Sequence, residues 1–339
     1  MEVLKRPHAV LLDELHDFYG DKAIVITGAG GSIGSAIAEQ LAAWQCRRLV
    51  LLDQFDHGLL DALERVSRID RRLDVIDALC DVRDSVRIER WLARVEPDIV
   101  IHAAALKHVH LGERHPGACV LTNLAGVRNT LAAAHRAGAQ NFTLVSSDKA
   151  ASPVCVMGAT KRLAELYLLG FEREHSAAMT LKSVRFGNVI GSQGSVLPRF
   201  SAQIAAGGPL EVTHPDMERF FMSVEEAVGL ILGVTRSSDE SGAYFMEMGD
   251  PVSILELGRE MIARSGRKIG VEFTGLRPGE KIKEELFDAA ETVAPTALPG
   301  VYKVAPRSAD AALSTREVDE LERIARTAED SVTMQRVFA

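Results

Sequence analysis

The chain has 339 residues, of which 47% are hydrophobic and 25% are charged, and its formal net charge at pH 7 is −8. This composition is typical of a folded globular protein long enough for about two domains, and it excludes a disordered chain. The acidic balance disfavours nucleic acid and anionic membrane surfaces as partners, because both attract positively charged proteins.

The first twenty residues, MEVLKRPHAVLLDELHDFYG, are predicted to form a lead segment and contain no apolar run long enough for a signal peptide. No stretch of the chain approaches the ~18 apolar residues of a membrane span. The four cysteines lie far apart without a CxxC pair, which predicts buried thiols in a reducing compartment rather than disulfides or a zinc site. We therefore expect a cytoplasmic protein.

From residue 21 onward, short apolar runs alternate with stretches of helical spacing. The predicted strands are residues 23–28, 47–53, 73–81, 97–105, 141–147 and 180–187. The predicted helices between them are residues 35–44, 58–69, 85–95 and the alanine-rich 124–138, which would pack on the sheet or contact a second subunit of a homo-oligomer. Continuous apolar strands separated by helices indicate an α/β fold, a Rossmann-type doubly wound parallel sheet over residues 21–186.

After Phe186 glycine and proline become frequent, and the regular alternation is lost. We predict a smaller mixed α/β substrate-binding region over residues 187–290, docked on the sheet edge, with some elements returning to the sheet. Its predicted elements are helices at 223–237 and 253–266 and a strand at 243–249. Residues 291–339 form a C-terminal extension in which only a helix near residues 315–329 is predicted. Ligands would bind at the carboxyl ends of the parallel strands.

A glycine motif, ITGAGGSIGSAIAEQL, joins the first predicted strand to the first predicted helix. Gly28 permits a tight turn, Gly31 lets the backbone approach a pyrophosphate, and Gly34 allows close packing of helix and strand. Ser32 and Ile33 lie at the start of the helix, whose amino end attracts an anion. The motif predicts a dinucleotide site.

Asp53 ends the second predicted strand, where a carboxylate accepts hydrogen bonds from the ribose hydroxyls of a dinucleotide. No arginine follows it immediately to hold a 2′-phosphate, so NAD is favoured over NADP. Asp81 and Val82, after the third predicted strand, could meet the adenine, although Asp81 is equally suited to cap a helix. Ala103, after the fourth, is a further expected cofactor contact.

Four motifs follow in order: HAAALKHVHLGERHP, SSDKAASPVCVMGATKR, RFGNVIGSQGSVLP and GLRPGEK. With the glycine motif, they make the chain resemble the extended short-chain dehydrogenase/reductase superfamily, and within it the polysaccharide-biosynthesis UDP-N-acetylglucosamine 4,6-dehydratases. The resemblance runs from about residue 5 to about residue 290. One branch of that family has methionine where the superfamily has a catalytic tyrosine, and Met157, four residues before Lys161, matches that branch.

The resemblance implies a nucleotide-sugar 4,6-dehydratase that converts UDP-N-acetylglucosamine to a UDP-4-keto-6-deoxy-hexosamine. The implied steps are oxidation at C4 with NAD, loss of water across C5–C6 and return of hydride to C6. A ketone at C4 acidifies the C5 proton. Such a site therefore needs a base near C5, an acid near O6 and an acceptor for the C4 hydroxyl proton.

Asp148 and Lys149 follow the fifth predicted strand and are the expected proton carriers. By our hypothesis Asp148 takes the C4 hydroxyl proton and later protonates the departing O6, while a neutral Lys149 abstracts the C5 proton. These roles require a raised pKa for the acid and a lowered pKa for the amine, as burial would produce, and Lys161 nearby would lower the amine further. Ser147 would hydrogen-bond the C4 oxygen.

Lys161 would hold the nicotinamide ribose, one helical turn after Met157, whose thioether cannot carry a proton. None of the four tyrosines has a sequence position from which it could replace a phenol there; they are Tyr19, Tyr167, Tyr244 and Tyr302.

Substrate anchors are expected from the second region. By resemblance, Asn188 contacts the diphosphate, and Arg219 and Arg277 hold it with planar, permanently charged donors. Glu280 belongs to the same LRPGEK motif as Arg277, and Lys107, in ALKHV, is a candidate for the sugar or a phosphate.

Other chemistries find less support. The histidines between residues 102 and 115 lack HExxH spacing, so no metal is predicted, and no GxSxG elbow indicates a hydrolase. A C5-inverting dehydratase, a nucleotide-sugar 4-epimerase and, in another class, a non-catalytic NAD-binding sensor stay open. The nucleotide base, the stereochemistry at C5 and the oligomer size are left open by the sequence.

Overall fold

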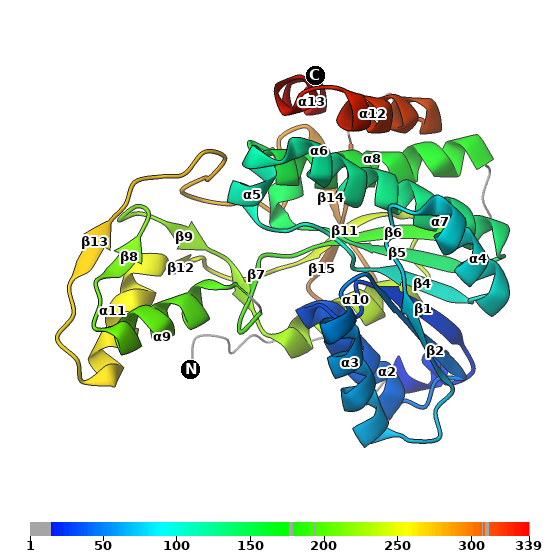
Figure 1. Cartoon of the computed structure of the whole chain (residues 1–339), viewed down its shortest axis with the longest axis horizontal. Helices are drawn as coiled ribbons and strands as arrows, with labels where there is room; N and C mark the ends of the chain where they lie inside the picture. The colour runs from blue at the N-terminus through cyan, green and yellow to red at the C-terminus, as the bar shows by residue number, and fades with distance from the viewer. Residues whose placement is uncertain (1–14, 176–178, 193, 307, 309–311, 339) are drawn as a thin grey trace.

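The computed structural model describes residues 15–175, 179–192, 194–306, 308 and 312–338, and a nine-stranded sheet forms its centre (Figure 1). The strands of this sheet are β1 (Ala23–Thr27), β2 (Arg48–Asp53), β3 (Val75–Leu79), β4 (Ile99–His102), β5 (Asn141–Val145), β6 (Thr180–Arg185), β11 (Gly242–Met246), β14 (Glu291–Pro295) and β15 (Val301–Pro306). Their order is β14-β15-β11-β6-β5-β4-β1-β2-β3, with β3 to β11 parallel. Successive strands extend the sheet to one side from β1 to β3 and to the other side from β4 onward. Ligands of such folds bind at the carboxyl ends of the strands where this order changes, between β1 and β4.

Helices cover both faces of the sheet. One face carries α1 (His16–Tyr19), α2 (Ser32–Ala43), α3 (Asp56–Ile69) and α10 (Val224–Arg236); the other carries α4 (Ser85–Val95), the π-helix η3 (Val120–Ala125), α7 (Gly126–Arg136) and α8 (Val156–His175). Within β1, Ile24 and Ile26 enter the first core and Val25 enters the second, so the strand is apolar throughout. The predicted doubly wound α/β fold and its first six strands are confirmed.

A smaller lobe lies beside the sheet, at the left of Figure 1. It contains α9 (Val196–Ala206), β8 (Leu210–Val212), α11 (Ile254–Ser265) and β13 (Val271–Phe273), and two short strand pairs, β7 (Asn188–Val189) with β10 (Phe221–Met222) and β9 (Glu218–Arg219) with β12 (Val252–Ser253). The lobe has its own core, in which Phe200, Leu210 and Leu257 are buried. The predicted helices at 223–237 and 253–266 are present, but only α11 belongs to the lobe, because α10 packs on the sheet.

The C-terminal part contains more structure than the sequence indicated. The predicted helix is confirmed as α12 (Thr315–Thr327), and α13 (Asp330–Val337) follows it. Both lie over α6 (Pro116–Cys119) and α8, at the top of Figure 1. The strands β14 and β15 were not predicted, because β14 is an edge strand whose side chains are mostly exposed.

No helix in the described part of the chain combines the length and apolar character needed to cross a bilayer.

Candidate active site

The turn between β1 and α2 depends on two glycines. Gly28 has a φ of +70°, in the left-handed region, and a β-carbon there would lie 2.6 Å from the backbone nitrogen of Ala104. A β-carbon on Gly34 would lie 2.2 Å from the carbonyl oxygen of Gly28. The helix therefore starts directly against the strand end, at Ser32, and its first amides can face an anion.

Asp53 braces this turn from the end of β2. Its Oδ2 accepts a hydrogen bond from the backbone nitrogen of Gly30 at 2.8 Å, and its Oδ1 accepts one from Phe55 at 2.9 Å. A cavity of about 200 Å³, here called the Asp53 cavity, is lined by Asp53 together with Val82 and Ala103. A carboxylate here suits ribose hydroxyls and repels a 2′-phosphate.

Asp81 does not cap α4, and its contact with the adenine stays a prediction. Val82, but not Asp81, lines the Asp53 cavity. Partial burial opposes ionisation of Asp81, but the Arg83 guanidinium, with Nε 2.8 and 3.0 Å from its two oxygens, holds the pKa of that carboxyl below its usual value. Asp84 caps α4 instead, accepting a hydrogen bond from the backbone nitrogen of Arg87 at 3.0 Å.

A second cavity of about 500 Å³, here called the Asp148 cavity, shares Gly28, Gly31 and Ala103 with the first. The predicted site residues that line it are Gly28, Gly31, Ser32, Ile33, Gly34, Ala103, Lys107, Ser147, Asp148, Lys149, Met157, Lys161 and Asn188. Three predicted substrate residues, Arg219, Arg277 and Glu280, do not line it. The glycine motif and the SSDKA stretch therefore line the same cavity.

Asp148 begins the short 3-10 helix η4 (Asp148–Ala150), directly after β5, and its side chain is 1% exposed. Its Oδ1 accepts hydrogen bonds from Ser147 Oγ and from Lys149 Nζ, both at 2.9 Å. Its buried Oδ2 has no hydrogen-bond partner within the described part of the chain. One oxygen thus anchors the carboxylate, while the other is a buried acceptor whose hydrogen-bonding capacity is unused in the described part of the chain.

Lys149 lies between two carboxylates. Its Nζ is 2.9 Å from Asp148 Oδ1 and 3.4 Å from Oε1 of Glu284, whose side chain is 5% exposed. Burial by itself would lower the pKa of Lys149, but the charges of Asp148 and Glu284 together raise it above its ordinary value. Our expectation of a lowered pKa and a neutral amine is therefore wrong for the ligand-free protein. The charges that act on Lys149 come from these two acids and Arg219 rather than from Lys161.

Lys161 and Met157 project from α8, one turn apart, and both line the Asp148 cavity. Lys161 Nζ donates to the carbonyl oxygen of Val145 at 2.8 Å, and burial lowers the pKa of Lys161 to about 8. No tyrosine lines either cavity, and the hydroxyl of Tyr167 faces Thr315 on α12 at 3.5 Å.

Arg219, on β9, fastens residues 277–284, here called the 277–284 segment. Its Nη1 donates to the carbonyl oxygen of Ile282 at 3.0 Å and its Nη2 to that of Lys281 at 2.9 Å. Within the segment, Glu280 accepts a hydrogen bond from the backbone nitrogen of Arg277 at 3.2 Å. These residues shape the segment that brings Glu284 against Lys149.

Two residues of the site were missed in the sequence analysis. Glu284 is one of three acids in EKIKEEL, and spacing alone does not indicate which of them turns inward. His108 lines the Asp148 cavity from the loop before α5 (Val109–Arg114). In the described ranges, no three His, Cys, Asp or Glu side chains are grouped so that they could hold a metal ion.

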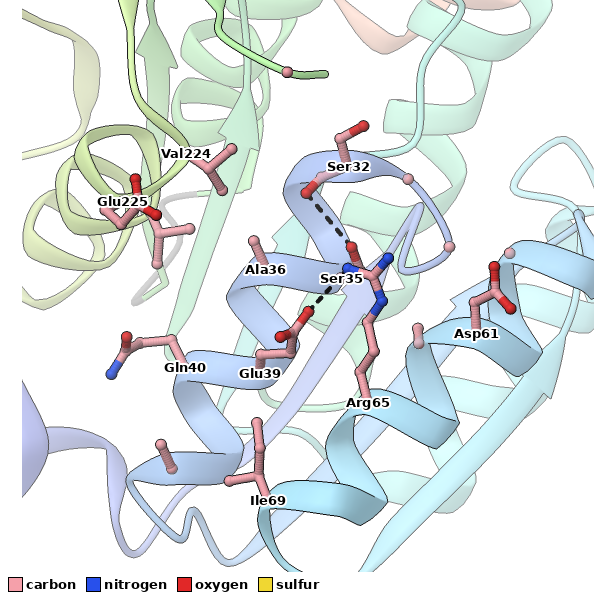
Figure 2. Close-up of a pocket in the computed structure, with 17 residues that line it drawn as sticks. Ser32, Ser35, Ala36, Glu39, Gln40, Asp61, Arg65, Ile69, Val224 and Glu225 are labelled. Atoms are coloured by element: carbon pink, nitrogen blue, oxygen red, sulfur yellow. Dashed lines mark hydrogen bonds and ion pairs between the residues drawn. The ribbon is translucent and has the colours of Figure 1, made fainter. Parts of the chain in front are cut away.

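A third hollow, of about 630 Å³, lies between α2, α3 and α10 and shares Gly31 and Ser32 with the Asp148 cavity (Figure 2). It contains none of the predicted catalytic residues. Arg65 reaches across from α3 to Glu39 on α2 at 3.2 Å, so these two charges neutralise each other.

The profile of one family, described as polysaccharide biosynthesis protein, matches residues 24–306. The chain belongs to this family. Its curated relatives include the probable polysaccharide biosynthesis protein EpsC of Bacillus subtilis, 37% identical over 88% of this chain and 50% of EpsC. The capsular polysaccharide biosynthesis protein CapD of Staphylococcus aureus is 39% identical over 80% of this chain and 46% of CapD. The chain thus spans about half the length of these two relatives.

This chain is also similar to an epimerase and to two proteins of known structure, one of which is named as a dehydratase. The UDP-glucose 4-epimerase of Rickettsia prowazekii is 31% identical over 84% of this chain and 83% of the epimerase. Pen from Bacillus thuringiensis superposes with a TM-score of 0.78 at 30% identity, covering 87% of this chain and 90% of Pen. The dTDP-glucose 4,6-dehydratase DesIV of Streptomyces venezuelae, solved with NAD and TYD bound, shares the fold with a TM-score of 0.71 at 20% identity. The superposition covers 90% of this chain and 96% of DesIV.

Proposed function

We propose that this protein is an NAD-dependent nucleotide-sugar 4,6-dehydratase of polysaccharide biosynthesis, acting on UDP-N-acetylglucosamine. The observation that carries the proposal is the buried Asp148–Lys149 pair, which lines the Asp148 cavity together with Met157 and the glycine turn. An acid and an amine in contact can both remove and supply protons, as loss of water across C5–C6 requires. The kinship with enzymes named as dehydratases and epimerases supports this reaction class.

The cofactor is NAD, which when bound supplies the acceptor for the hydride of C4. The residues that would hold it fit a dinucleotide: a close-packed glycine turn, the amino end of α2 and the carboxylate of Asp53. Lys161, which is buried and lines the Asp148 cavity, would hold the nicotinamide ribose.

Asp148 is the proton carrier for the sugar oxygens. Its Oδ2 accepts the C4 hydroxyl proton, because that oxygen has no other partner in the described chain and Ser147 holds its neighbour Oδ1. The resulting carboxylic acid then delivers the proton to O6 as water leaves. One residue thereby covers two proton transfers, and Met157 need not take part in either.

Lys149 is the base at C5, and it must first lose the proton that it carries in the ligand-free protein. Substrate in the cavity removes water from around the amine, which favours its neutral form. Protonation of Asp148 by the C4 hydroxyl removes one of the two negative charges that hold the ammonium. Both changes make Lys149 a base only after substrate has bound.

Asn188 and Lys107, which line the Asp148 cavity, anchor the sugar diphosphate, and Arg277 adds a charged donor from the 277–284 segment. Arg219 and Glu280 contribute by holding that segment in place rather than by direct contact. Substrate binding therefore depends on the smaller lobe as well as on the sheet.

The decisive experiment is incubation of the purified protein with UDP-N-acetylglucosamine and a panel of other nucleotide hexoses in D₂O, with NMR of the product. We expect a 4-keto-6-deoxy sugar that carries deuterium at C5. Absence of turnover with every nucleotide sugar, despite bound NAD, would leave the non-catalytic NAD-binding sensor as the better explanation.

A 4-epimerase is the second candidate, favoured by the 31% identity to the Rickettsia enzyme. Epimerisation needs oxidation at C4 but no acid for O6. An unchanged C6 hydroxymethyl group in the product would therefore support the epimerase. A 6-deoxy product with the opposite configuration at C5 would instead identify a C5-inverting dehydratase.

A further inference from the structure

Glu284 is a buried carboxylate that belongs to neither cavity. Its Oε1 lies 3.4 Å from Lys149 Nζ and 3.9 Å from Arg219 Nη2, and its side chain is 5% exposed. A carboxylate removed from water is costly unless cations compensate it. Here two cations compensate the carboxylate of Glu284: the ammonium of Lys149 and the guanidinium of Arg219.

The charges around Lys149 form a balanced group. Asp148 and Glu284 face it with negative charge, and Arg219 faces it with positive charge from β9. The thiol of Cys155 also lies near Lys149, but burial raises the pKa of Cys155, so this group stays neutral. Two carboxylates therefore match one ammonium and one guanidinium, and loss of Glu284 would leave an uncompensated positive charge beside Lys149.

We propose that Glu284 is a positioning residue that acts through Lys149: it fixes the ammonium against Asp148 and sets the pH at which Lys149 becomes a base. Glu284 does not line the Asp148 cavity, and its carboxylate lies against Lys149 and Arg219 instead. The inference rests on the proposed function, in which a neutral Lys149 removes the C5 proton. It also explains why the 277–284 segment is fastened by Arg219, since the position of Glu284 depends on that segment.

The first test needs no substrate. In Glu284→Gln the shape is retained and the charge is lost, and the matched control is Glu285→Gln, which removes an exposed carboxylate one residue later. The readout is the pH dependence of Lys149 acetylation by acetic anhydride, followed by peptide mass spectrometry of the ligand-free protein. We expect the titration midpoint of Lys149 to fall by about one pH unit or more in Glu284→Gln. It should stay unchanged in Glu285→Gln.

A third variant, Glu284→Asp, keeps the negative charge but shortens the side chain. It separates the effect of the charge on Lys149 from the effect of disturbed packing. It should hold the Lys149 midpoint closer to that of the unaltered protein than Glu284→Gln does, although both variants disturb packing. An unchanged midpoint in Glu284→Gln, or an equal fall in Glu284→Asp, overturns the proposal.

The second test separates this inference from the proposed function. With UDP-N-acetylglucosamine, the acid limb of the kcat profile should move to lower pH in Glu284→Gln, in the same direction as the labelling midpoint. If the midpoint moves but no nucleotide sugar is turned over, the proposed function fails and the role of Glu284 as the group that sets the charge of Lys149 stands. If turnover occurs and neither the midpoint nor the acid limb moves, the role of Glu284 fails and the function stands.

Discussion

Met157 places a thioether one helical turn before Lys161, where the superfamily that the sequence resembles has a catalytic tyrosine. Its side chain is buried and lines the Asp148 cavity, yet it has no proton to exchange. In the proposed mechanism, the unpartnered Oδ2 of Asp148, in η4 after β5, is the proton acceptor instead of a group on α8. The proposed proton transfer therefore depends on a residue that follows a strand rather than on one in the helix.

This division of labour predicts unequal effects of substitution. Asp148→Asn and Lys149→Ala should each lower kcat by roughly 10²–10⁴-fold, because each removes a proton carrier. Met157→Ala should keep kcat within about tenfold of the unaltered enzyme, since it removes only packing. Steady-state kinetics on all three variants, with NAD content as the control for folding, would check this; equal losses for Met157→Ala and Asp148→Asn would contradict it.

Lys161 makes a pH-dependent contribution to stability. Burial lowers its pKa to about 8 in the folded protein, against 10.5 as its ordinary value. Between these values the unfolded chain binds more protons, so the free energy of unfolding rises with pH. From pH 7.5 to 9.5 this single group should add about 2 kcal/mol.

The prediction for Lys161 is tested as a difference, because buried thiols act in the opposite direction at alkaline pH. Urea unfolding of the unaltered protein and of Lys161→Met at pH 7.5 and 9.5 gives that difference directly. If both proteins change in stability by the same amount, Lys161 is not the buried amine that its surroundings indicate.

At the scale of elements, a buried group of ionic side chains joins β6, α8 and β14. Arg185 of β6, 0% exposed, donates to Glu165 of α8 at 2.6 Å and to Glu291 of β14 at 2.7 Å. Glu165 also accepts a hydrogen bond from Ser146 Oγ at 2.6 Å, next to Ser147. This group fixes α8 relative to the end of β5, and thus Lys161 relative to Asp148.

The contact between β1 and α2 predicts the effect of a single added methyl group. A β-carbon at Gly34 would lie 2.2 Å from the carbonyl oxygen of Gly28, so the helix start must move away from the strand. Gly34→Ala should therefore weaken NAD binding by about tenfold or more, equivalent to ~1.4 kcal/mol.

The matched control is Gly270→Ala, since no atom lies within 4 Å of an added β-carbon there. Calorimetric titration of the cofactor-free proteins with NAD gives both affinities. Equal binding by the two variants would show that the close approach at Gly34 is unimportant for the cofactor.

At the scale of the whole molecule, the C-terminal helices complete the second core. Val318 of α12 is fully buried and belongs to the same core as residues of α7 and α8, and the backbone nitrogen of Gly117 on α6 donates to Asp330 of α13 at 3.2 Å. Arg128 of α7 is paired with Glu322 of α12. These helices cover the side of α8 away from the sheet (Figure 1).

Val318→Asp should therefore destabilise the whole fold, by about 3–5 kcal/mol, because it buries an unpaired charge. Val332→Asp is the matched control, since Val332 on α13 is 43% exposed. Urea unfolding of both variants checks the prediction. Similar stabilities would mean that α12 packs too loosely to form part of the core.

The sequence by itself determined the parallel sheet, its first six strands and the glycine turn. These features follow from local patterns: a strand buried on both faces is apolar throughout, and a close helix–strand contact requires glycine. The motifs also indicated residues after β5 and on α8 that line one cavity in the structure. Composition and residue spacing are enough to predict a structural feature when it is caused by residues close in the sequence or by burial of a whole strand or helix face.

Only the tertiary structure decided the charge of Lys149, the surroundings of Asp81 and the places of β14 and β15. Lys149 is held as an ammonium because Glu284, far along the chain, reaches it through the 277–284 segment. Asp81 is paired with the guanidinium of Arg83. A charge interaction depends on distance in space, which spacing along the sequence does not give. The charge of Lys149 beside Asp148 could therefore be inferred only from the fold.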